Sequence, residues 1–363
     1  MQFFLVWRIV VAVSSKLQDK AQTPMKRSTA PGDDRRSRSD PPDAELTTVN
    51  RSKRLRLRAA WMYYVERKTQ TEIADALEVG RVTVVRLLAD AIARNEVRIT
   101  IEGDVAELVA IERKLEERFG LTEAIVAPIA GPASDRTHIV SAATGAFVSE
   151  FVRPGMQLGV GWGRTLIESL AFMPSRQLAD FTVVSLLGGI TEARRFNPSE
   201  YAWQLSQAFG GECYLLSAPA VVDSPQTRDI LIEKCGLHRI FAMAKTLDAA
   251  IFSVGGMASN ATIFQSGYMG EAERAALAAS GAVGDVLYHF FNRAGALTGH
   301  PLNERVMSIP GDTIRAIPRR ILASGGADKP EAILGAIKFV KPTVMITDAL
   351  TAAEVLALDG GSH

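Results

Sequence analysis

The chain of 363 residues is poor in cysteine, has almost no net charge and contains no long apolar run. Its two cysteines, Cys213 and Cys235, lie far apart and outside any CxxC pattern, which argues against a metal site and a disulfide framework. We therefore expect a reducing, cytoplasmic environment. No stretch approaches the roughly 18 apolar residues of a membrane helix, so we expect no membrane partner.

Charge and motif content exclude further classes of protein. Lysine and arginine number 41 against 40 aspartate and glutamate, so the net charge of +1 does not describe a polycation for nucleic acid. Neither a GxGxxG fingerprint nor a GxxxxGK motif followed by Ser or Thr occurs, which gives no support for nucleotide binding. We expect no cofactor.

The first 50 residues have too few large apolar side chains for a core. The opening FFLVWRIVVAV is interrupted by Arg8 and is followed by no clear cleavage site, which argues against an export signal. Residues 14–50 are rich in Ser, Pro, Asp, Lys and Arg, a composition typical of disorder. We expect a disordered basic tail or a misassigned start over residues 1–50, with Met25 as a later candidate.

A helix-turn-helix unit is predicted next. Thr69 and Glu72 have the spacing of a capping box, which places a helix start at about Gln70. Counted from Gln70, small Ala74 is fifth and branched Val84 is fifteenth, which are the close-contact and core positions of this motif. After the second helix, the run NEVRITI predicts a short strand.

The second helix of this motif is predicted to bind DNA. Eleven basic and six acidic residues lie between Arg51 and Ile101, a local charge of +5 that favours contact with a duplex. Arg81 is the first candidate for a base contact, because arginine near the start of such a helix can pair with a base edge. The predicted DNA-binding residues are Gln70, Thr71, Arg81, Val82, Thr83, Val85 and Arg86.

Two features precede this motif. The basic run 51–58 either contacts phosphate or is a solvated helix start, since phosphate contacts need little beyond charge. Trp61, Tyr64 and Val65 recur at i, i+3 and i+4, which predicts core positions of the first helix rather than a stacking platform.

Residues after the motif change from helical to mixed patterning. A helix is predicted over 105–119, with an apolar stripe that packs either on its own domain or on a second copy. Apolar runs then alternate with helical ones and predict an α/β domain with a mainly parallel sheet. The expected strands are AIVAPI, MQLGVGWG, FTVVSLLGG, ECYLLSAPA, AAIFSVGGM, RRILASGG and TVMITD. The expected domains are 51–103 for DNA, 104–120 as a linker helix, 121–358 for an effector and 359–363 as a tail.

Four predicted strands end in similar glycine turns. These are GWGRT at 161–165, SLLGG at 185–189, SVGG at 253–256 and SGG at 324–326, the last followed by Lys329. Glycine lets the backbone approach a ligand, and amides at a helix start point toward an anion. One such turn usually only closes a connection, but four at the carboxyl ends of strands predict a phosphate-sized site.

Several longer segments together resemble the SorC family of sugar-binding transcriptional regulators. The resemblance covers about residues 59–356 and rests on AAWMYYVERKTQTEIADAL with VTVVRLL, GVGWGRT, GAVGDVLYHFF, GGADKPEAILGAI and ITDALTA. It implies a winged-type helix-turn-helix head and an effector domain similar in fold to sugar-phosphate isomerases and deaminases. It also implies a homo-oligomer, a dimer or tetramer, that controls carbohydrate catabolism genes. Its affinity for a double-stranded DNA operator would change with a sugar, polyol or sugar-phosphate effector.

The resemblance also implies effector contacts. These fall at Gly163, Arg164, Thr165, Gly188, Gly189, Asp285 and Lys329. Asp285 can accept from sugar hydroxyls, and Lys329 can neutralise a phosphate or bond a hydroxyl. The alternatives are a cap or turn for Asp285 and a solvated helix start for Lys329. The glycine turns and Lys329 favour a phosphorylated sugar.

The turn of the DNA-binding motif departs from the family pattern. Glu78 stands where the family usually has Gly, and a left-handed residue other than Gly costs roughly 1 kcal/mol. Gly80 replaces a capping Ser at a cost of a few tenths of a kcal/mol. Val82 and Val85 replace a Pro and a Ser. We expect the fold to be kept. The second helix should make more contacts with thymine methyl groups and fewer hydrogen bonds to phosphates. The operator sequence of the family cannot be carried over to this chain.

Two other functions fit parts of the sequence. A sugar-phosphate isomerase or deaminase with a DNA-binding head needs a paired acid and base, and no histidine lies in such a motif beside a glycine turn. We therefore expect a regulator with no catalytic residue. A head that binds protein fits the small net charge, but the local +5 disfavours it, and salt-sensitive binding to duplex DNA would exclude it.

Overall fold

The computed structural model describes residues 43–97, 105–190, 197–265 and 269–360. The chain divides into two compact units, residues 1–103 and 104–363, which are described separately. The strand predicted at NEVRITI, and with it the wing, falls largely outside the described residues, as do the opening apolar run and Met25. None of the helices in the described ranges combines the length and apolar content that crossing a membrane requires.

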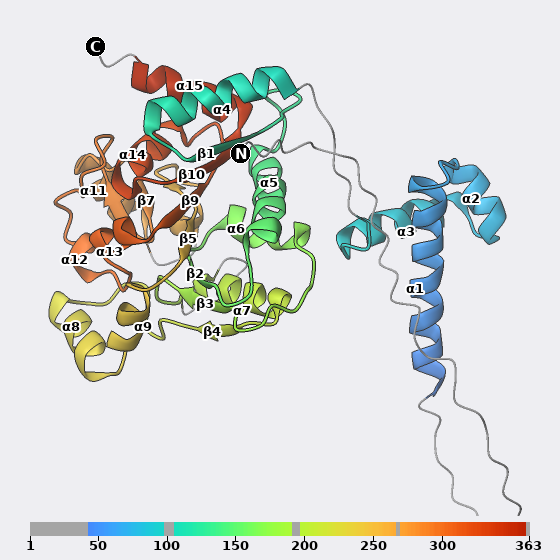
Figure 1. The fold of residues 1–363 in the computed structure, drawn as a ribbon, viewed down its shortest axis with the longest axis horizontal. Coiled ribbons are helices and arrows are strands. Elements are labelled where there is room, and N and C mark those ends of the chain that lie inside the picture. The colour runs from blue at the N-terminus through green and yellow to red at the C-terminus, as the bar shows by residue number, and fades with distance from the viewer. Residues whose placement is uncertain (1–42, 98–104, 191–196, 266–268, 361–363) are drawn as a thin grey trace, which may run out of the picture. The chain divides into compact units, whose positions relative to one another are not determined.

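The first unit is built from three helices (Figure 1): α1 (Asp43–Tyr64), α2 (Gln70–Leu77) and α3 (Arg81–Ala93). The predicted capping box opens α2, because the Thr69 hydroxyl accepts from the Glu72 amide while the Glu72 carboxylate accepts from the Thr69 amide. Ala74 and Val84 are buried, as their positions in the motif predict. The small core of this unit contains Ala59, Ala60, Met62, Ile73, Ala74, Val84, Leu87, Leu88, Ala91 and Val97.

The prediction of core positions near the end of α1 was wrong for Trp61 and Val65, which are 46% and 40% exposed. Tyr64 is half-buried and packs against the core of this unit, as predicted. The buried apolar positions are Ala59, Ala60 and Met62, and α1 packs against α3. Trp61 lies two residues, or roughly 200° of helix rotation, from Ala59 and therefore faces away from this contact.

The start of α1 and its basic run also differ from expectation. α1 begins at Asp43, eight residues before the expected boundary, because residues 43–50 contain no Gly or Pro and two prolines directly precede them. Within the basic run, Arg56 is shielded from solvent and therefore cannot contact a DNA phosphate. It is buried and forms an ion pair with Glu96, with Nε to Oε2 at 2.5 Å. Arg51, Lys53, Arg54 and Arg58 remain exposed.

The second unit contains a seven-stranded sheet in which every pairing is parallel, in the order β1-β10-β9-β5-β2-β3-β4. Its strands are β1 (Glu123–Ala127), β2 (Gln157–Val160), β3 (Thr182–Ser185), β4 (Glu212–Tyr214), β5 (Ala249–Phe252), β9 (Arg319–Ala323) and β10 (Val344–Asp348). Six of them lie within the runs predicted as strands, and β1 begins one residue before its predicted run AIVAPI. A second, antiparallel sheet of β6 (Gly255–Gly256), β7 (Gly284–Val286) and β8 (His289–Phe291) was not predicted.

Helices pack around the large sheet. They are α4 (Val105–Phe119), α5 (Arg136–Phe151), α6 (Arg164–Ser169), η1 (Leu170–Phe172), α7 (Pro198–Phe209), α8 (Pro225–Lys234), α9 (His238–Met243), α10 (Thr262–Gln265), α11 (Glu271–Ala279), α12 (Leu302–Arg305), α13 (Gly311–Ala316), α14 (Pro330–Val340) and α15 (Ala349–Gly360). α15 packs against both α14 and α4, while α5 packs against α6 and β10 (Figure 1). The apolar stripe of α4 packs on its own domain, because Leu115 is fully buried and Leu108 and Ile111 contact the core.

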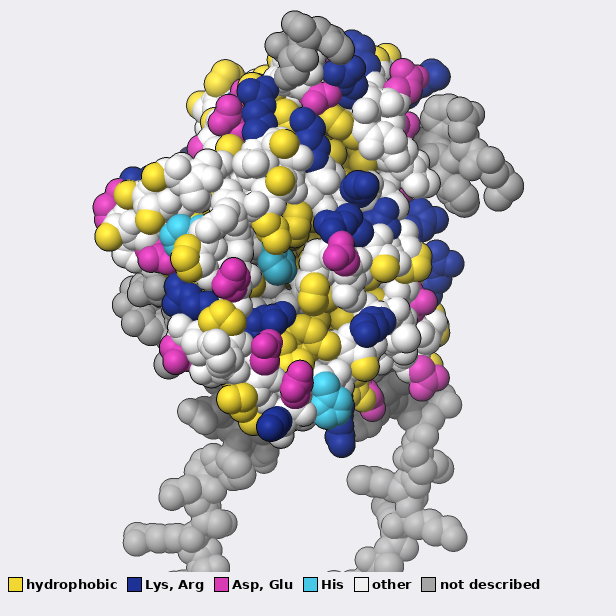
Figure 2. Space-filling model, turned by 90° about the vertical axis from the view of Figure 1, so that its left-hand side faces the viewer, with side chains coloured by type: hydrophobic (Ala, Val, Ile, Leu, Met, Phe, Trp, Pro, Cys, Tyr) yellow, Lys and Arg dark blue, Asp and Glu magenta, His cyan; other side chains and the backbone are white. Residues whose placement is uncertain are grey.

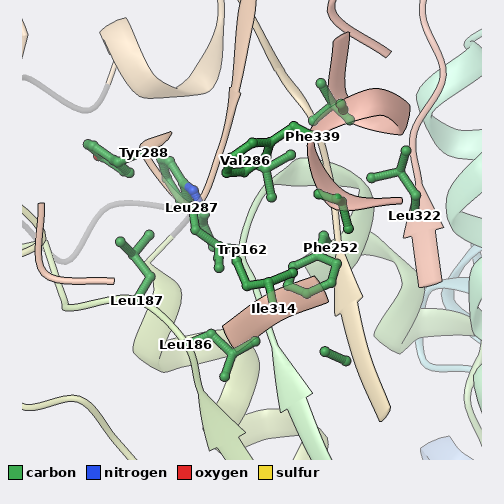
Figure 3. Close-up of a cluster of buried hydrophobic side chains, with 14 of the residues drawn as sticks. Trp162, Leu186, Leu187, Phe252, Val286, Leu287, Tyr288, Ile314, Leu322 and Phe339 are labelled. Atoms are coloured by element: carbon green, nitrogen blue, oxygen red, sulfur yellow. The ribbon is translucent and has the colours of Figure 1, made fainter. Parts of the chain in front are cut away.

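The largest core connects the two sheets of this unit. Figure 3 shows Trp162, which follows β2, close to Leu287 and Tyr288 of the turn between β7 and β8, and Leu186, which follows β3, in the same cluster of buried residues. The rings of Trp162 and Tyr288 stack with centroids 5.4 Å apart. The surface that carries α8, α11 and α12 has basic and acidic groups interspersed with apolar ones (Figure 2). That surface therefore lacks the single-sign charge of a nucleic-acid footprint.

Candidate functional site

The sheet has a topological switch point between β2 and β5. From β2 the chain continues outward to β3 and β4, whereas from β5 it continues in the opposite direction to β9 and β10. The loops after β2 and β5 therefore diverge and leave a crevice at the carboxyl ends of these central strands. Such crevices are the usual ligand sites of open α/β sheets.

A cavity of about 280 Å³ occupies this crevice. Three of the four predicted glycine turns, those after β2, β5 and β9, contribute to it, because these strands are consecutive in the sheet. Its lining includes Asp135, Arg136, Trp162, Gly163, Arg164, Ser253, Gly255, Gly256, Asn260, Thr262, Asp285, Gly326, Asp328 and Lys329. Apolar residues, among them Trp162, Val254 and Ile263, also line it, so the cavity offers both polar and apolar contacts.

Glycine is required at three of these positions. Gly163 and Gly326 have φ angles of +125° and +142°, which residues with a side chain rarely adopt. A Cβ on Gly255 would lie 1.9 Å from Oδ1 of Asp285. The absence of a side chain at Gly255 therefore makes room for the Asp285 carboxylate beside the loop that follows β5.

Asp285 reaches the cavity from β7 and is almost fully buried, at 2% exposure. Its Oδ2 accepts a hydrogen bond from the Tyr288 amide at 2.9 Å, which supports a hairpin turn in which Leu287 and Tyr288 both have positive φ. Its Oδ1 has no hydrogen-bond partner within the described chain. One oxygen thus holds the turn, as the alternative interpretation of this residue proposed, and the other can still bond a ligand.

Burial perturbs both charged groups at the base of the site. Burial raises the pKa of Asp285 to about 6, although the Tyr288 amide and the charge of Lys329 oppose the rise. Burial lowers the pKa of the Lys329 ammonium, and the charge of Asp328 partly offsets this effect. The cavity therefore holds a carboxyl group that can donate or accept and an ammonium group of reduced solvation, both suited to hydroxyl or anionic ligands.

The Asp285 pKa predicts a pH-dependent stability. Because the folded pKa of about 6 exceeds the ordinary value of 3.8, the contribution of Asp285 is fully present below about pH 4 and is lost as pH rises through 6. Two pKa units correspond to roughly 3 kcal/mol. In urea unfolding, the stability of the protein relative to Asp285→Asn should fall by roughly 2 to 3 kcal/mol between pH 4 and 7.

The comparison with Asp285→Asn also removes an opposing effect. Burial lowers the pKa of His289 to about 4, so His289 makes the protein less stable as pH falls below 6.5. The contribution of His289 is present in both proteins, so it cancels when the free energy of unfolding of one is subtracted from that of the other. A difference that stays constant with pH would show that Asp285 does not titrate in this range.

Two long helices begin at the cavity, so that the positive ends of their dipoles lie beside it. Residues 134–137 at the start of α5 and residues 328–329 before α14 line it. Asp135 caps α5 by accepting from the His138 amide at 3.2 Å, and it also pairs with Arg164 at 3.2 Å. Helix N-termini favour anions, and three basic groups (Arg136, Arg164 and Lys329) stand beside them.

Comparison with known proteins agrees with this geometry. The sugar-binding domain family, Sugar-bind, matches residues 103–357. The chain belongs to the SorC family of sugar-binding transcriptional regulators. It is 30% identical to the erythritol catabolism regulatory protein EryD of Brucella abortus (strain 2308), over 85% of this chain and 98% of that protein. It is 33% identical to the deoxyribonucleoside regulator of Bacillus subtilis (strain 168), over 82% of this chain and 96% of that protein.

A solved structure shares the same architecture. The full-length sorbitol operon regulator SorC of Klebsiella pneumoniae matches with a TM-score of 0.66 and 26% identity, covering 84% of this chain and 98% of that one. The predicted family and fold class are therefore confirmed, and this SorC-family chain is a DNA-binding transcriptional regulator with a sugar-binding domain.

Not all residues assigned from the SorC-family resemblance meet at the cavity. Gly163, Arg164, Asp285 and Lys329 line it, whereas Thr165, Gly188 and Gly189 do not. A Cβ on Gly188 would lie 2.6 Å from the Ala218 carbonyl oxygen, so this glycine permits close packing of the chain after β4. Thr165 is buried behind the turn, and its hydroxyl lacks a hydrogen-bond partner within the described residues. Gly188 therefore fits the alternative interpretation of a glycine at a strand end, which is that it only closes the connection.

Several lining residues were not predicted. Arg136 follows β1 and begins α5, so it lies at the carboxyl end of a predicted strand. Applying the strand-end rule to every strand, with or without glycine, would have found it. Asn260 and Thr262 lie in the loop after β6, which had no recognisable pattern because β6 contains only two residues.

The DNA-binding helix presents the predicted residues. Arg81, Val82, Val85 and Arg86 are exposed, with Val82 at 84%, while Thr83 is half-buried. Of the α2 residues, Thr71 is exposed and Gln70 is half-buried. The departures at the turn are tolerated as expected: Glu78 has a left-handed φ of +53° and ψ of +44°, and Gly80 starts α3 without a side-chain cap.

Proposed function

We propose that the chain binds a DNA operator through α2 and α3, and that a carbohydrate effector in the switch-point cavity changes its operator affinity. The observation that carries this proposal is the cavity itself, a space of about 280 Å³ lined by Lys329 and by Asp285, whose buried Oδ1 has no hydrogen-bond partner among the described residues. A ligand with several hydroxyls and one anionic group matches these partners. A free carboxyl oxygen accepts hydroxyl protons, while basic groups and helix N-termini attract the anion.

Phosphorylated sugars or polyols are the effector class we favour. Related proteins are named for erythritol, deoxyribonucleosides and sorbitol, so carbohydrate catabolism genes are the proposed targets. The lining carries Arg136, Arg164 and Lys329 against Asp135, Asp285 and Asp328. Equal numbers of both signs suit a polyhydroxyl compound with a single phosphate better than a bisphosphate, since each extra negative charge would meet a carboxylate.

The assembly is proposed to be a homodimer or a tetramer built from dimers. Two copies of α3 could then bind half-sites separated by whole turns of DNA, as paired helix-turn-helix units do. The exposed side chains of Trp61 on α1 and of Val65, which directly follows this helix, offer apolar area for such pairing within the DNA-binding unit.

A thermal-shift screen tests the effector class directly. Sugars and polyols would be compared with their monophosphates, because a ligand selective for the folded state raises stability by mass action. We expect stabilisation by at least one monophosphate and a weaker effect of its unphosphorylated parent. Stabilisation by neutral compounds alone would leave a regulator with a different effector, and turnover of a sugar phosphate would instead support the enzyme alternative.

A further inference from the structure

Arg136 stands between the cavity and the C-terminal helix α15. It lines the cavity with only 8% of its surface exposed. Its Nη1 donates to Oε2 of Glu354 at 3.0 Å and to Oγ1 of Thr351 at 3.4 Å, and its Nη2 donates to Oε1 of Glu354 at 3.4 Å. Glu354 therefore occupies one forked edge of the guanidinium. The Nε of Arg136 is buried and has no hydrogen-bond partner within the described chain, so the forked edge that Glu354 does not occupy carries an unsatisfied donor.

The same contact is connected to the glycine turn that precedes Lys329. Oγ1 of Thr351 accepts from the Gly326 amide at 3.1 Å and donates to Oδ2 of Asp348 at 2.6 Å. The Thr351 amide donates to Oδ1 of Asp348 at 2.9 Å. Thr351 and Asp348 are fully buried. A buried polar group that loses its hydrogen-bond partner destabilises the fold, because it cannot bond to water instead. These hydrogen bonds therefore hold the glycine turn against the first residues of α15.

The far end of α15 is joined to α4. Nε of Arg118 donates to Oδ2 of Asp359 at 2.6 Å, and Nη2 of Arg118 donates to the Asp359 carbonyl oxygen at 3.1 Å. α4 is also anchored on the free edge of β1, whose amides donate to Glu112 and Glu116 at 2.9 Å. In the chain, α4 is the first helix after the DNA-binding unit. A contiguous series of contacts therefore leads from the cavity to the segment that continues into that unit.

We propose that Arg136 binds the anionic group of the effector and that its ion pair with Glu354 couples effector binding to α15 and α4. This inference rests on the proposed function and specifies its regulation. An oxyanion on the Nε edge competes with Glu354 for one guanidinium, so the Glu354 contact weakens when the cavity is filled. The effector thereby favours a state in which α15 holds α4 less firmly, and that difference between states is what can change DNA affinity.

The first test concerns coupling without any ligand. Glu354→Gln removes the charge that Arg136 binds, and Glu150→Gln makes the same chemical change at an exposed position of α5. Hydrogen–deuterium exchange of the full-length protein should become several-fold faster in both α15 and α4 for Glu354→Gln, and should stay unchanged in these helices for Glu150→Gln. Faster exchange confined to α15, with α4 unaffected, would overturn the coupling.

The second test concerns the anion. Binding of ribose 5-phosphate and ribose would be measured by calorimetry for the unaltered protein, Arg136→Gln and Arg136→Lys. We expect the unaltered protein to bind ribose 5-phosphate more tightly than ribose. In Arg136→Gln the ratio of these two affinities should fall at least tenfold, while ribose still binds. In Arg136→Lys the ratio should be partly restored. Equal preference in the unaltered protein and Arg136→Gln, or no binding of ribose 5-phosphate at millimolar concentration, would overturn the role of Arg136.

A third measurement separates this inference from the proposed function. Operator affinity is measured with and without ribose 5-phosphate for the unaltered protein and Glu354→Gln. We expect a smaller response of operator affinity in Glu354→Gln, although it still binds both DNA and ribose 5-phosphate. A full response in Glu354→Gln would refute the coupling and leave the proposed function intact. An unaltered protein that binds no operator would refute the proposed function itself.

Discussion

Arg81→Ala is expected to weaken binding to a selected operator by roughly 5- to 150-fold, because a bidentate arginine–base contact is worth about 1–3 kcal/mol of discrimination. Arg81 is the first residue of α3 and is exposed, and its neighbour Val82 is 84% exposed. In helix-turn-helix proteins the first residues of the second helix contact base edges. Binding to unrelated duplex DNA should change far less, since one phosphate contact among several is lost at most.

The matched control for Arg81 is Arg94→Ala. Arg94 is also exposed and lies at the other end of α3, where it is the residue after the last helical turn. Fluorescence anisotropy at two salt concentrations distinguishes the two kinds of contact. A base-reading residue changes affinity for the selected operator, whereas a phosphate-binding residue changes both DNAs and the salt dependence. Equal loss on operator and unrelated DNA after Arg81→Ala would assign Arg81 to phosphate.

Lys329→Ala is expected to abolish the effect of a phosphorylated effector on operator affinity while leaving operator affinity itself unchanged. Lys329 lies at the start of α14 and lines the cavity together with Asp285. Its positive charge lowers the pKa of Asp285, so the variant also loses a partner for that carboxyl group. An effector that changes operator affinity by a typical 5- to 150-fold should change it less than twofold in the variant.

Lys245→Ala controls for the loss of a positive charge. Lys245 follows α9 and is exposed, and it is not among the residues that line the cavity. It should respond to the effector as the unaltered protein does. Gel-shift titrations with and without the effector found in the thermal-shift screen provide the measurement. If Lys329→Ala keeps the full response, Lys329 is a solvated helix start and Arg136 binds the anion without it.

Local pattern was sufficient for the DNA-binding motif. The capping box at Thr69 and Glu72, the left-handed conformation of Glu78 and the burial of Val84 all depend on residues within a few positions in sequence. The face of α1 was predicted wrongly because its burial depends on which helix it meets. Ala59, Ala60 and Met62 are buried in the core that the three helices share, whereas Trp61 lies on another side of α1 and is exposed.

The sequence by itself determined the family, the seven strands of the large sheet, three glycine turns that line the cavity, and the cavity residues Asp285 and Lys329. Only the tertiary structure decided which strands are neighbours, and hence that the glycine turns after β2, β5 and β9 share a cavity while Gly188 packs elsewhere. It also decided that Arg136 meets Glu354, 218 residues later in the chain. The physical reason is range: capping, turn conformation and apolar periodicity act between near neighbours in sequence, whereas strand order and ion pairs between distant segments arise only when the whole core is packed.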